Sequence, residues 1–236
     1  MNLLIQQVVI IGSVWPEPRS SAAGANMLSL IQLFLQQGWL VTFASPAQPG
    51  EQRADLSSLG VHEQPIALNC SSFDEWIVTV QPDMVLFDRF MMEEQFGWRV
   101  EQQCPEALRV LDTEDLHCLR DARQKLLKDA LNKTDISQNQ TLPQHSMTEI
   151  AACLVESDLA QREVAAIYRC DLSLLLSDVE IVLLHKHLGV PETLMHHVPF
   201  LLNATAIETL PMFSARKDFI CIGNFLHAPN WDAVLC

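Results

Sequence analysis

The sequence predicts an α/β protein built on a doubly wound parallel sheet of the Rossmann-like class. Two observations predict this fold. Short apolar runs, typical of strands that are buried on both faces, alternate with segments of helical periodicity along most of the 236 residues. Hydrophobic residues make up 49% of the chain, which is ample material for a buried core.

The first βαβ unit has the clearest pattern. Residues 8–12 form a continuous apolar run, and the loop that follows over 13–21 contains two prolines, which exclude regular structure. Residues 22–37 have apolar side chains at helical spacing. Gly38 stands where a left-handed C-cap is expected, and the second apolar run begins at once, over 40–44. We therefore expect strand, loop, helix and strand in this order.

The same alternation continues toward the C-terminus. A polar stretch rich in Asn and Gln, residues 132–146, is expected to be a mobile surface insertion. The remaining expected strands are 61–68, 84–88, 108–112, 172–176 and 193–198, and the remaining expected helices are 73–80, 92–103, 114–131, 149–168 and 179–188.

The pattern predicts a domain boundary after residue 203. Residues 1–203 are expected to form one Rossmann-like domain, and 204–217 a linker. Residues 218–223 form a new apolar run into a glycine, 224–230 a loop, and 231–236 the start of a helix. This order repeats that of the first unit, so 218–236 is expected to be the beginning of a second domain, cut off in its first helix.

Charge and cysteine content narrow the function. The net charge of −14 disfavours nucleic acid and anionic membrane surfaces as partners, and no apolar run is long enough to span a bilayer. Seven scattered cysteines without CxxC spacing indicate reduced thiols and a cytoplasmic protein. His185-x-His187 and His196-His197 lack the partners that a metal site needs, so we expect neither metal nor cofactor.

Open α/β sheets bind ligands beyond the carboxyl ends of their strands, so the residues there are the candidates for chemistry. Gly24, near the start of the first helix, would let the backbone approach an anionic ligand, or it only relieves crowding beside the loop. Arg19 in the same loop would hold an anionic group of an acceptor, or it is a solvated side chain. Asp88 and Arg89 follow a strand end and either line the pocket or form a local ion pair.

A second cluster of candidates follows the strand that ends at Asp112. Asp112, Glu114 and His117 offer carboxylates and an imidazole that can deprotonate an acceptor hydroxyl or stabilise an oxocarbenium charge. The alternative is helix capping, with Asp112 or Thr113 as N-cap and Glu114 and Asp115 in the first turn.

Two segments, 15–24 and 219–234, resemble the group 1 (family 4-like) glycosyltransferases, whose GT-B fold places two Rossmann-like domains face to face. Segments 112–117 and 177–180 also resemble the N-terminal domain of this family. The resemblance implies a nucleotide-sugar donor, a carbohydrate or other hydroxyl acceptor bound by this N-terminal half, and Asp178 as a further substrate-binding residue.

The donor side of the resemblance falls on the last segment. The resemblance would place Gly223, His227 and Asn230 beside the donor. The stretch 223–232 contains no Lys or Arg for a diphosphate, and the acidic pair of the family's donor domain is missing. We therefore expect no transferase activity from this polypeptide alone.

Two other functions remain open. One is a non-catalytic, Rossmann-like module that binds a glycan or a protein partner, and the other is a nucleotide-sugar epimerase-like enzyme. An apolar C-terminal segment without a sheet to join would also permit self-association, through Phe219, Ile220, Ile222 and Trp231.

Overall fold

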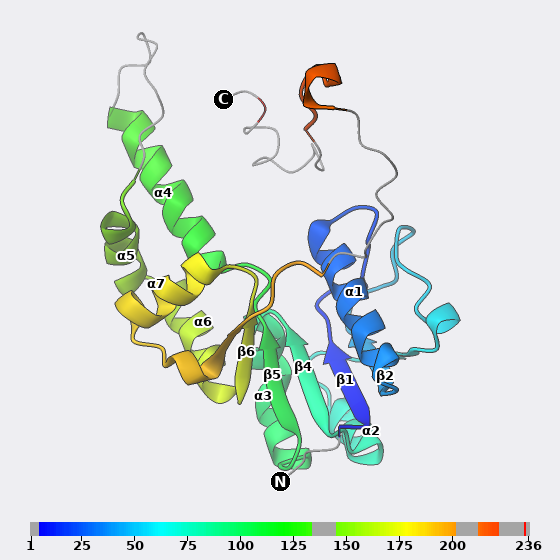
Figure 1. Ribbon diagram of the computed structural model, residues 1–236. Helices are drawn as coiled ribbons and strands as arrows, with labels where there is room; N and C mark the ends of the chain where they lie inside the picture. Colours follow the sequence, from blue (N-terminus) through cyan, green and yellow to red (C-terminus); the bar gives the residue numbers. More distant parts are fainter. Residues whose placement is uncertain (1–4, 134–144, 202–211, 222–233, 235–236) are drawn as a thin grey trace.

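A computed structural model describes residues 5–133, 145–201, 212–221 and 234 of the chain. It contains a seven-stranded sheet in the order β3-β2-β1-β4-β5-β6-β7, in which every neighbouring pair is parallel (Figure 1). The expected α/β class and doubly wound sheet are confirmed. The strands are β1 (Gln7–Ile11), β2 (Leu40–Ser45), β3 (His62–Pro65), β4 (Met84–Asp88), β5 (Leu108–Asp112), β6 (Leu172–Leu175) and β7 (Met195–His197).

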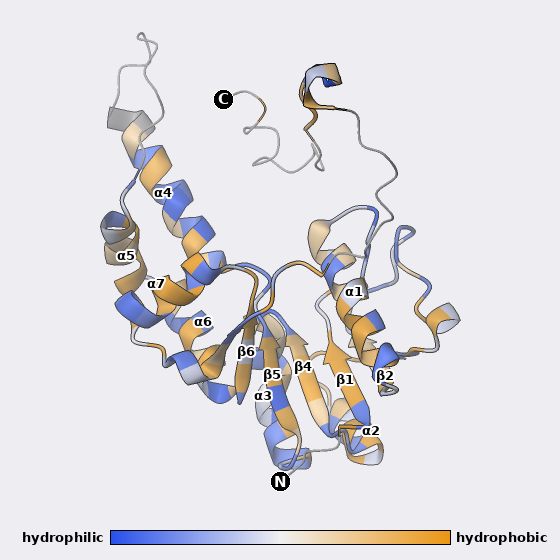
Figure 2. Cartoon of the chain, viewed as in Figure 1, coloured by the Kyte–Doolittle hydropathy of each residue, from blue (hydrophilic) through white to orange (hydrophobic). Residues whose placement is uncertain are grey.

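Helices connect the strands and cover both faces of the sheet. Alternate residues of β1 belong to different cores, with Val8 and Ile10 packed in the cluster that includes α1, and Val9 and Ile11 in the cluster that includes α3. The apolar residues concentrate along these buried strands (Figure 2). The helices are α1 (Ala22–Gln36), α2 (Ser72–Val80), α3 (Phe90–Gln103), α4 (His117–Lys133), α5 (Met147–Val155), α6 (Asp158–Arg169) and α7 (Asp178–Leu188).

The strand order creates a switch point beside β1. The chain moves from β1 outward to β2 and β3, then returns to the other side of β1 with β4. The loops that leave β1 and β4 therefore diverge at the carboxyl edge of the sheet. A crevice at this place is where open α/β sheets bind their ligands.

The prediction of one helix over 149–168 is wrong, because the chain forms α5 and α6 with a break between them. The Ser157 hydroxyl accepts a hydrogen bond from the Ala160 amide (3.3 Å), and the Ser157 amide donates to the Leu154 carbonyl (3.0 Å). Ser157 thus ends one helix and caps the next. The serine–aspartate pair at 157–158 was the available sequence signal for this cap.

The helix expected from residue 114 begins instead at His117. Glu114 has a left-handed backbone with φ of 58°, which is incompatible with the first turn of an α-helix. Gly38 does have the expected left-handed conformation, with φ of 77° after α1.

The strand expected over 218–223 is wrong in its described part. Residues 218–221 form no strand, and Phe219 and Ile220 are fully or largely exposed. A buried strand needs neighbours for its backbone groups, and these residues pair with no strand in the described part of the chain. Self-association through this segment stays a prediction.

Some expectations fall on residues outside the described ranges. These are most of the polar stretch 132–146, the linker up to 211, the loop 224–230 and nearly all of the last helix. The domain boundary after residue 203 stays a prediction as well. None of the helices that the structure describes has the length and apolar character to cross a bilayer.

Candidate functional site

A cavity of about 260 Å³ lies at the switch point between β1 and β4. The loop after β1 and the first turn of α1 line one side of it, including Trp15, Glu17 and Gly24. The loop after β4 contributes Asp88 and Arg89, and Glu114 reaches the cavity from beyond β5. The cavity thus collects residues from three strand ends, as the sequence analysis expected of a ligand site.

The loop 13–21 is held against α1 by close backbone packing. A Cβ on Gly24 would lie 2.6 Å from backbone atoms of Glu17, so only glycine allows this approach. The Gly24 amide donates to the hydroxyl of Ser21, the N-cap of α1, at 3.0 Å. These contacts give Gly24 a packing role. Its function in binding an anionic ligand stays a proposal.

Trp15 forms a fixed wall of the cavity. Its indole Nε1 donates to the Ala47 carbonyl at 2.8 Å, and its ring lies 5.6 Å from that of Phe43. Only 3% of its surface is exposed. A rigid aromatic side chain beside polar groups is typical of ligand pockets.

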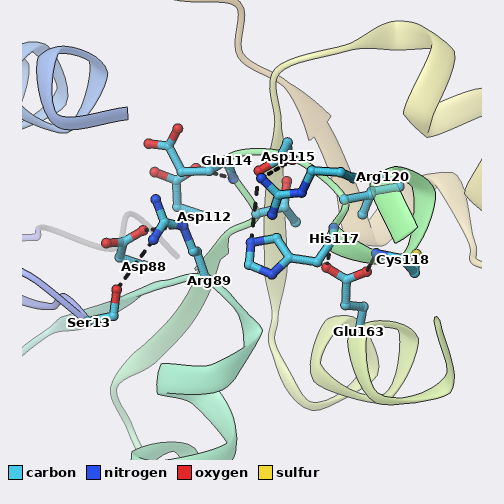
Figure 3. A network of polar contacts seen from close by, with 12 residues as sticks. Ser13, Asp88, Arg89, Asp112, Glu114, Asp115, His117, Cys118, Arg120 and Glu163 are labelled. Atoms are coloured by element: carbon cyan, nitrogen blue, oxygen red, sulfur yellow. Dashed lines mark hydrogen bonds and ion pairs between the residues drawn. The ribbon is translucent and has the colours of Figure 1, made fainter. Parts of the chain in front are cut away.

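Three buried carboxylates meet beside the cavity, as the close view in Figure 3 shows. Asp88 and Asp112 are the last residues of β4 and β5 and lie directly opposite each other in the sheet. Glu114 follows two residues later, and its amide donates to Asp112 at 3.4 Å. One oxygen of each carboxylate lacks a hydrogen-bond partner among the described residues.

Burial and mutual repulsion keep these acids protonated to unusually high pH. Burial raises the pKa of Asp112 to about 7, and the charge of Asp88 adds to the rise. Burial also raises the pKa of Glu114 to about 8, with Asp112 and then Asp88 contributing. Burial raises the pKa of Asp88, while the cation of Arg89 opposes this. Groups with pKa values near neutrality are suited to proton transfer.

Arg89 places a guanidinium cation beside the carboxylates, and its backbone conformation is strained. Its φ of 72° and ψ of 155° are tolerated almost only by glycine, and Glu114 also has a positive φ. The Arg89 amide donates to the Asp112 carbonyl at 2.8 Å, which fixes this geometry. Strained residues cluster at functional sites, and both of these line the same cavity.

The contacts of Arg89 are loose. Its Nε lies 3.8 Å from an Asp88 oxygen, and a terminal nitrogen donates to the Ser13 hydroxyl at 3.5 Å. Asp88 and Arg89 thus line the cavity and also form a local ion pair, and their role in binding a ligand stays a prediction.

The capping alternative for the Asp112 cluster is wrong. The amides of His117 and Cys118, at the start of α4, donate to both oxygens of Glu163 at 2.9 and 2.7 Å. Glu180 accepts from the Leu116 amide at 3.2 Å. Carboxylates from α6 and α7 thus satisfy the start of α4. Glu114 lines the cavity, and Asp112, two residues earlier at the end of β5, lies outside the lining.

Glu163 and Glu180 are residues that the sequence analysis missed. In the sequence, Glu163 is flanked by Ala160, Ala166 and Ile167 at helical spacing, so it stands on the apolar face of its helix. A carboxylate in such a position was the available signal. Its partner amides, more than forty residues away in sequence, could not be deduced from the pattern.

His117 lies beside the cluster and outside the lining of the cavity. Its ring meets the edge of Phe90, and its Nε2 is 3.9 Å from Asp115. Burial lowers its pKa, and the cation of Arg120 adds to this effect. The imidazole is therefore neutral near pH 7. Its catalytic role stays a proposal.

Other candidates lie apart from the cavity. Arg19 is exposed and borders a different hollow with Arg53 and Asp55. Asp178 is exposed in the first turn of α7. The donor-side candidates, Gly223, His227 and Asn230, lie outside the described residues. Among the residues that the structure describes, no three His, Cys, Asp or Glu side chains are grouped to hold a metal ion.

Comparisons with known proteins give matches among solved structures alone. No protein-family model matches the chain, and no curated protein does. The apo form of the lipopolysaccharide outer core galactosyltransferase WaaB is 10% identical, with a TM-score of 0.49 over 89% of this chain and 50% of that one. Sucrose-phosphate synthase from Thermosynechococcus elongatus is 13% identical, with a TM-score of 0.49 over 82% and 48%.

A third match is an alpha-glucosyltransferase in complex with UDP and a 13-mer DNA, 11% identical, with a TM-score of 0.47 over 84% of this chain and 43% of that one. The chain thus spans about half the length of the structures that it matches. Similarity at this level assigns no activity, so the proposals below are argued from the residues of the site.

Proposed function

We propose that this chain is the acceptor-binding half of a glycosyltransferase that uses a nucleotide-sugar donor. The acceptor hydroxyl occupies the switch-point cavity beside Glu114 and Asp88. The charge of the lining is the observation that supports this assignment. Glu17, Asp88 and Glu114 outnumber Arg89, the single Lys or Arg among the described residues of the lining.

The excess of carboxyl groups in the lining favours binding of the acceptor, and not of the nucleotide-sugar donor, in the cavity. A nucleotide diphosphate needs several cations or a run of free amides, whereas buried carboxylates repel it. Sugar hydroxyls donate hydrogen bonds, and carboxylate oxygens without a partner accept them. The diphosphate of the donor would therefore be held by another domain.

Glu114 is the proposed general base. With a pKa of about 8, the Glu114 carboxyl is largely protonated at pH 7. Its ionised fraction, which grows as the pH rises toward 8, would accept the hydroxyl proton as the sugar is transferred. Arg89 beside it stabilises the ionised form of the cluster. His117 and Asp112 would act from the neighbouring positions.

The epimerase-like alternative has less support. Epimerases of this architecture would bind a dinucleotide through a glycine-rich turn after the first strand. Between residues 12 and 24 the chain has glycine at these two ends only, which does not fit that fingerprint. No observation favours a non-catalytic module over the acceptor site.

Blocking the cavity tests the proposal. Saturation-transfer NMR on the whole chain with a panel of hexoses should give signals that disappear in Ala23→Trp, since Ala23 lines the cavity and carries no charge. Leu33→Trp, on an exposed face of the same helix, is the matched control and should keep the signals. Equal signals from both variants would place sugar binding elsewhere and refute the proposal.

A further inference from the structure

The acidic cavity can discriminate between ligands by their charge, in addition to binding their hydroxyl groups. We propose that the cavity recognises an acceptor that carries a positively charged nitrogen, as an amino sugar does, with the ammonium between Asp88 and Glu114. This inference rests on the proposed function and names the class of acceptor.

The two carboxylates are buried and line the same cavity. Asp88 is 6% exposed and Glu114 is 4% exposed, and both line the cavity. Oδ1 of Asp88 and Oε1 of Glu114 have no hydrogen-bond partner in the described part of the molecule. Buried polar groups in folded proteins are rarely left unpaired, and such exceptions indicate a ligand or another missing partner.

The charged groups that line the cavity also favour a cationic ligand. The loop after β1 contributes Glu17, β4 and its loop contribute Asp88 and Arg89, and the loop after β5 contributes Glu114, with Asp112 directly behind. Three carboxyl groups thus line the cavity beside one guanidinium, and Asp112 lies outside the lining. A cationic ligand would stabilise the ionised forms of Glu114 and Asp112, which burial and mutual repulsion otherwise disfavour.

Arg89 does not satisfy the hydrogen-bonding capacity of these carboxylates. Its Nε stays 3.8 Å from Asp88, beyond hydrogen-bond distance, and is itself without a hydrogen-bond partner among the described residues. The backbone of Arg89 is also strained, with φ of 72° and ψ of 155°. Burial and then the neighbouring carboxylates raise the pKa values of Asp112 and Glu114, although the cation of Arg89 opposes the rise.

A metal ion fits the site less well than an organic cation. Asp88 and Glu114 are potential metal ligands, but among the described residues no three His, Cys, Asp or Glu side chains are grouped to hold a metal ion. An ammonium has three donors and needs no fixed coordination geometry, so it can bridge two carboxylate oxygens from different strands.

Three sugars with the same ring test the inference on the whole chain at pH 7. Glucosamine, N-acetylglucosamine and glucose carry an ammonium, a neutral amide and a hydroxyl at one position. Glucosamine should bind at least about tenfold more tightly than glucose, because it adds charge-assisted hydrogen bonds. N-acetylglucosamine should resemble glucose. Chemical shifts of the Trp15 indole report binding in this cavity.

The variants Glu114→Gln and Asp88→Asn should abolish the preference for glucosamine, whereas Glu101→Gln, an exposed carboxylate on α3, should keep it. Equal affinity for all three sugars would overturn the inference and leave the proposed function standing. Absence of binding by any of them would overturn both. Displacement of glucosamine by Mg²⁺ in a Glu114-dependent manner would also overturn it, by showing a metal site.

Discussion

Glu114→Gln should change how the stability of the protein depends on pH. The folded state raises the pKa of this carboxyl from 4.5 to about 8, so between these values the folded protein retains a proton that the unfolded chain has lost. Stability therefore falls as pH rises through this window. The shift of about 3.5 units corresponds to roughly 5 kcal/mol at most, at about 1.4 kcal/mol per unit.

The assay is urea unfolding, followed by tryptophan fluorescence, at pH 5 and pH 8.5. Glutamine has nearly the same shape as glutamate but does not titrate. The stability of Glu114→Gln minus that of the wild type should therefore increase by several kcal/mol between pH 5 and pH 8.5. Glu101→Gln is the control, since Glu101 is exposed and should leave the profile unchanged. Parallel pH profiles for Glu114→Gln and the wild type would refute the electrostatic description of the cluster.

Four further predictions concern the scaffold of the site. Gly24→Ala should destabilise the protein by about 1–3 kcal/mol in thermal unfolding, because its Cβ would meet the Glu17 backbone, and an unchanged midpoint would contradict this packing. Arg89→Gly should be about 1 kcal/mol more stable than Arg89→Ala, since only glycine tolerates this backbone without strain, and equal stability would argue against strain. Glu163→Ala should cost about 1–3 kcal/mol by leaving two amides at the start of α4 unpaired, more than the same change at the more exposed Glu94. Deletion of 204–236 should leave the unfolding midpoint unchanged, and a decrease of several degrees would make that segment part of the first domain.

Most of the fold was predictable because its signal is local. Strands β1 and β4 are buried on both faces, so their apolar runs are continuous and stand out in the sequence. The break at Ser157 was missed since the apolar periodicity continues across it. The strand expected over 218–223 failed for the opposite reason, because an apolar run predicts a strand only where a sheet is available.

The candidate site was predictable in part. The rule that ligands bind beyond strand ends correctly placed Asp88 and Glu114 next to one cavity. The same rule could not distinguish these two residues from His117, which lies three residues after Glu114 in the sequence and does not line the cavity. The capping of α4 by Glu163 and the strain at Arg89 depend on distant contacts, and no spacing in the sequence encodes them.

The location of the bound acceptor tests the central claim most directly. Backbone and indole chemical shifts of the whole chain, titrated with the sugar that binds best, would map that location. We expect shifts at Trp15, at the start of α1 and at residues 88–89 and 114. Shifts confined to another surface, such as the apolar groove between α5, α6 and α7, would contradict the claim.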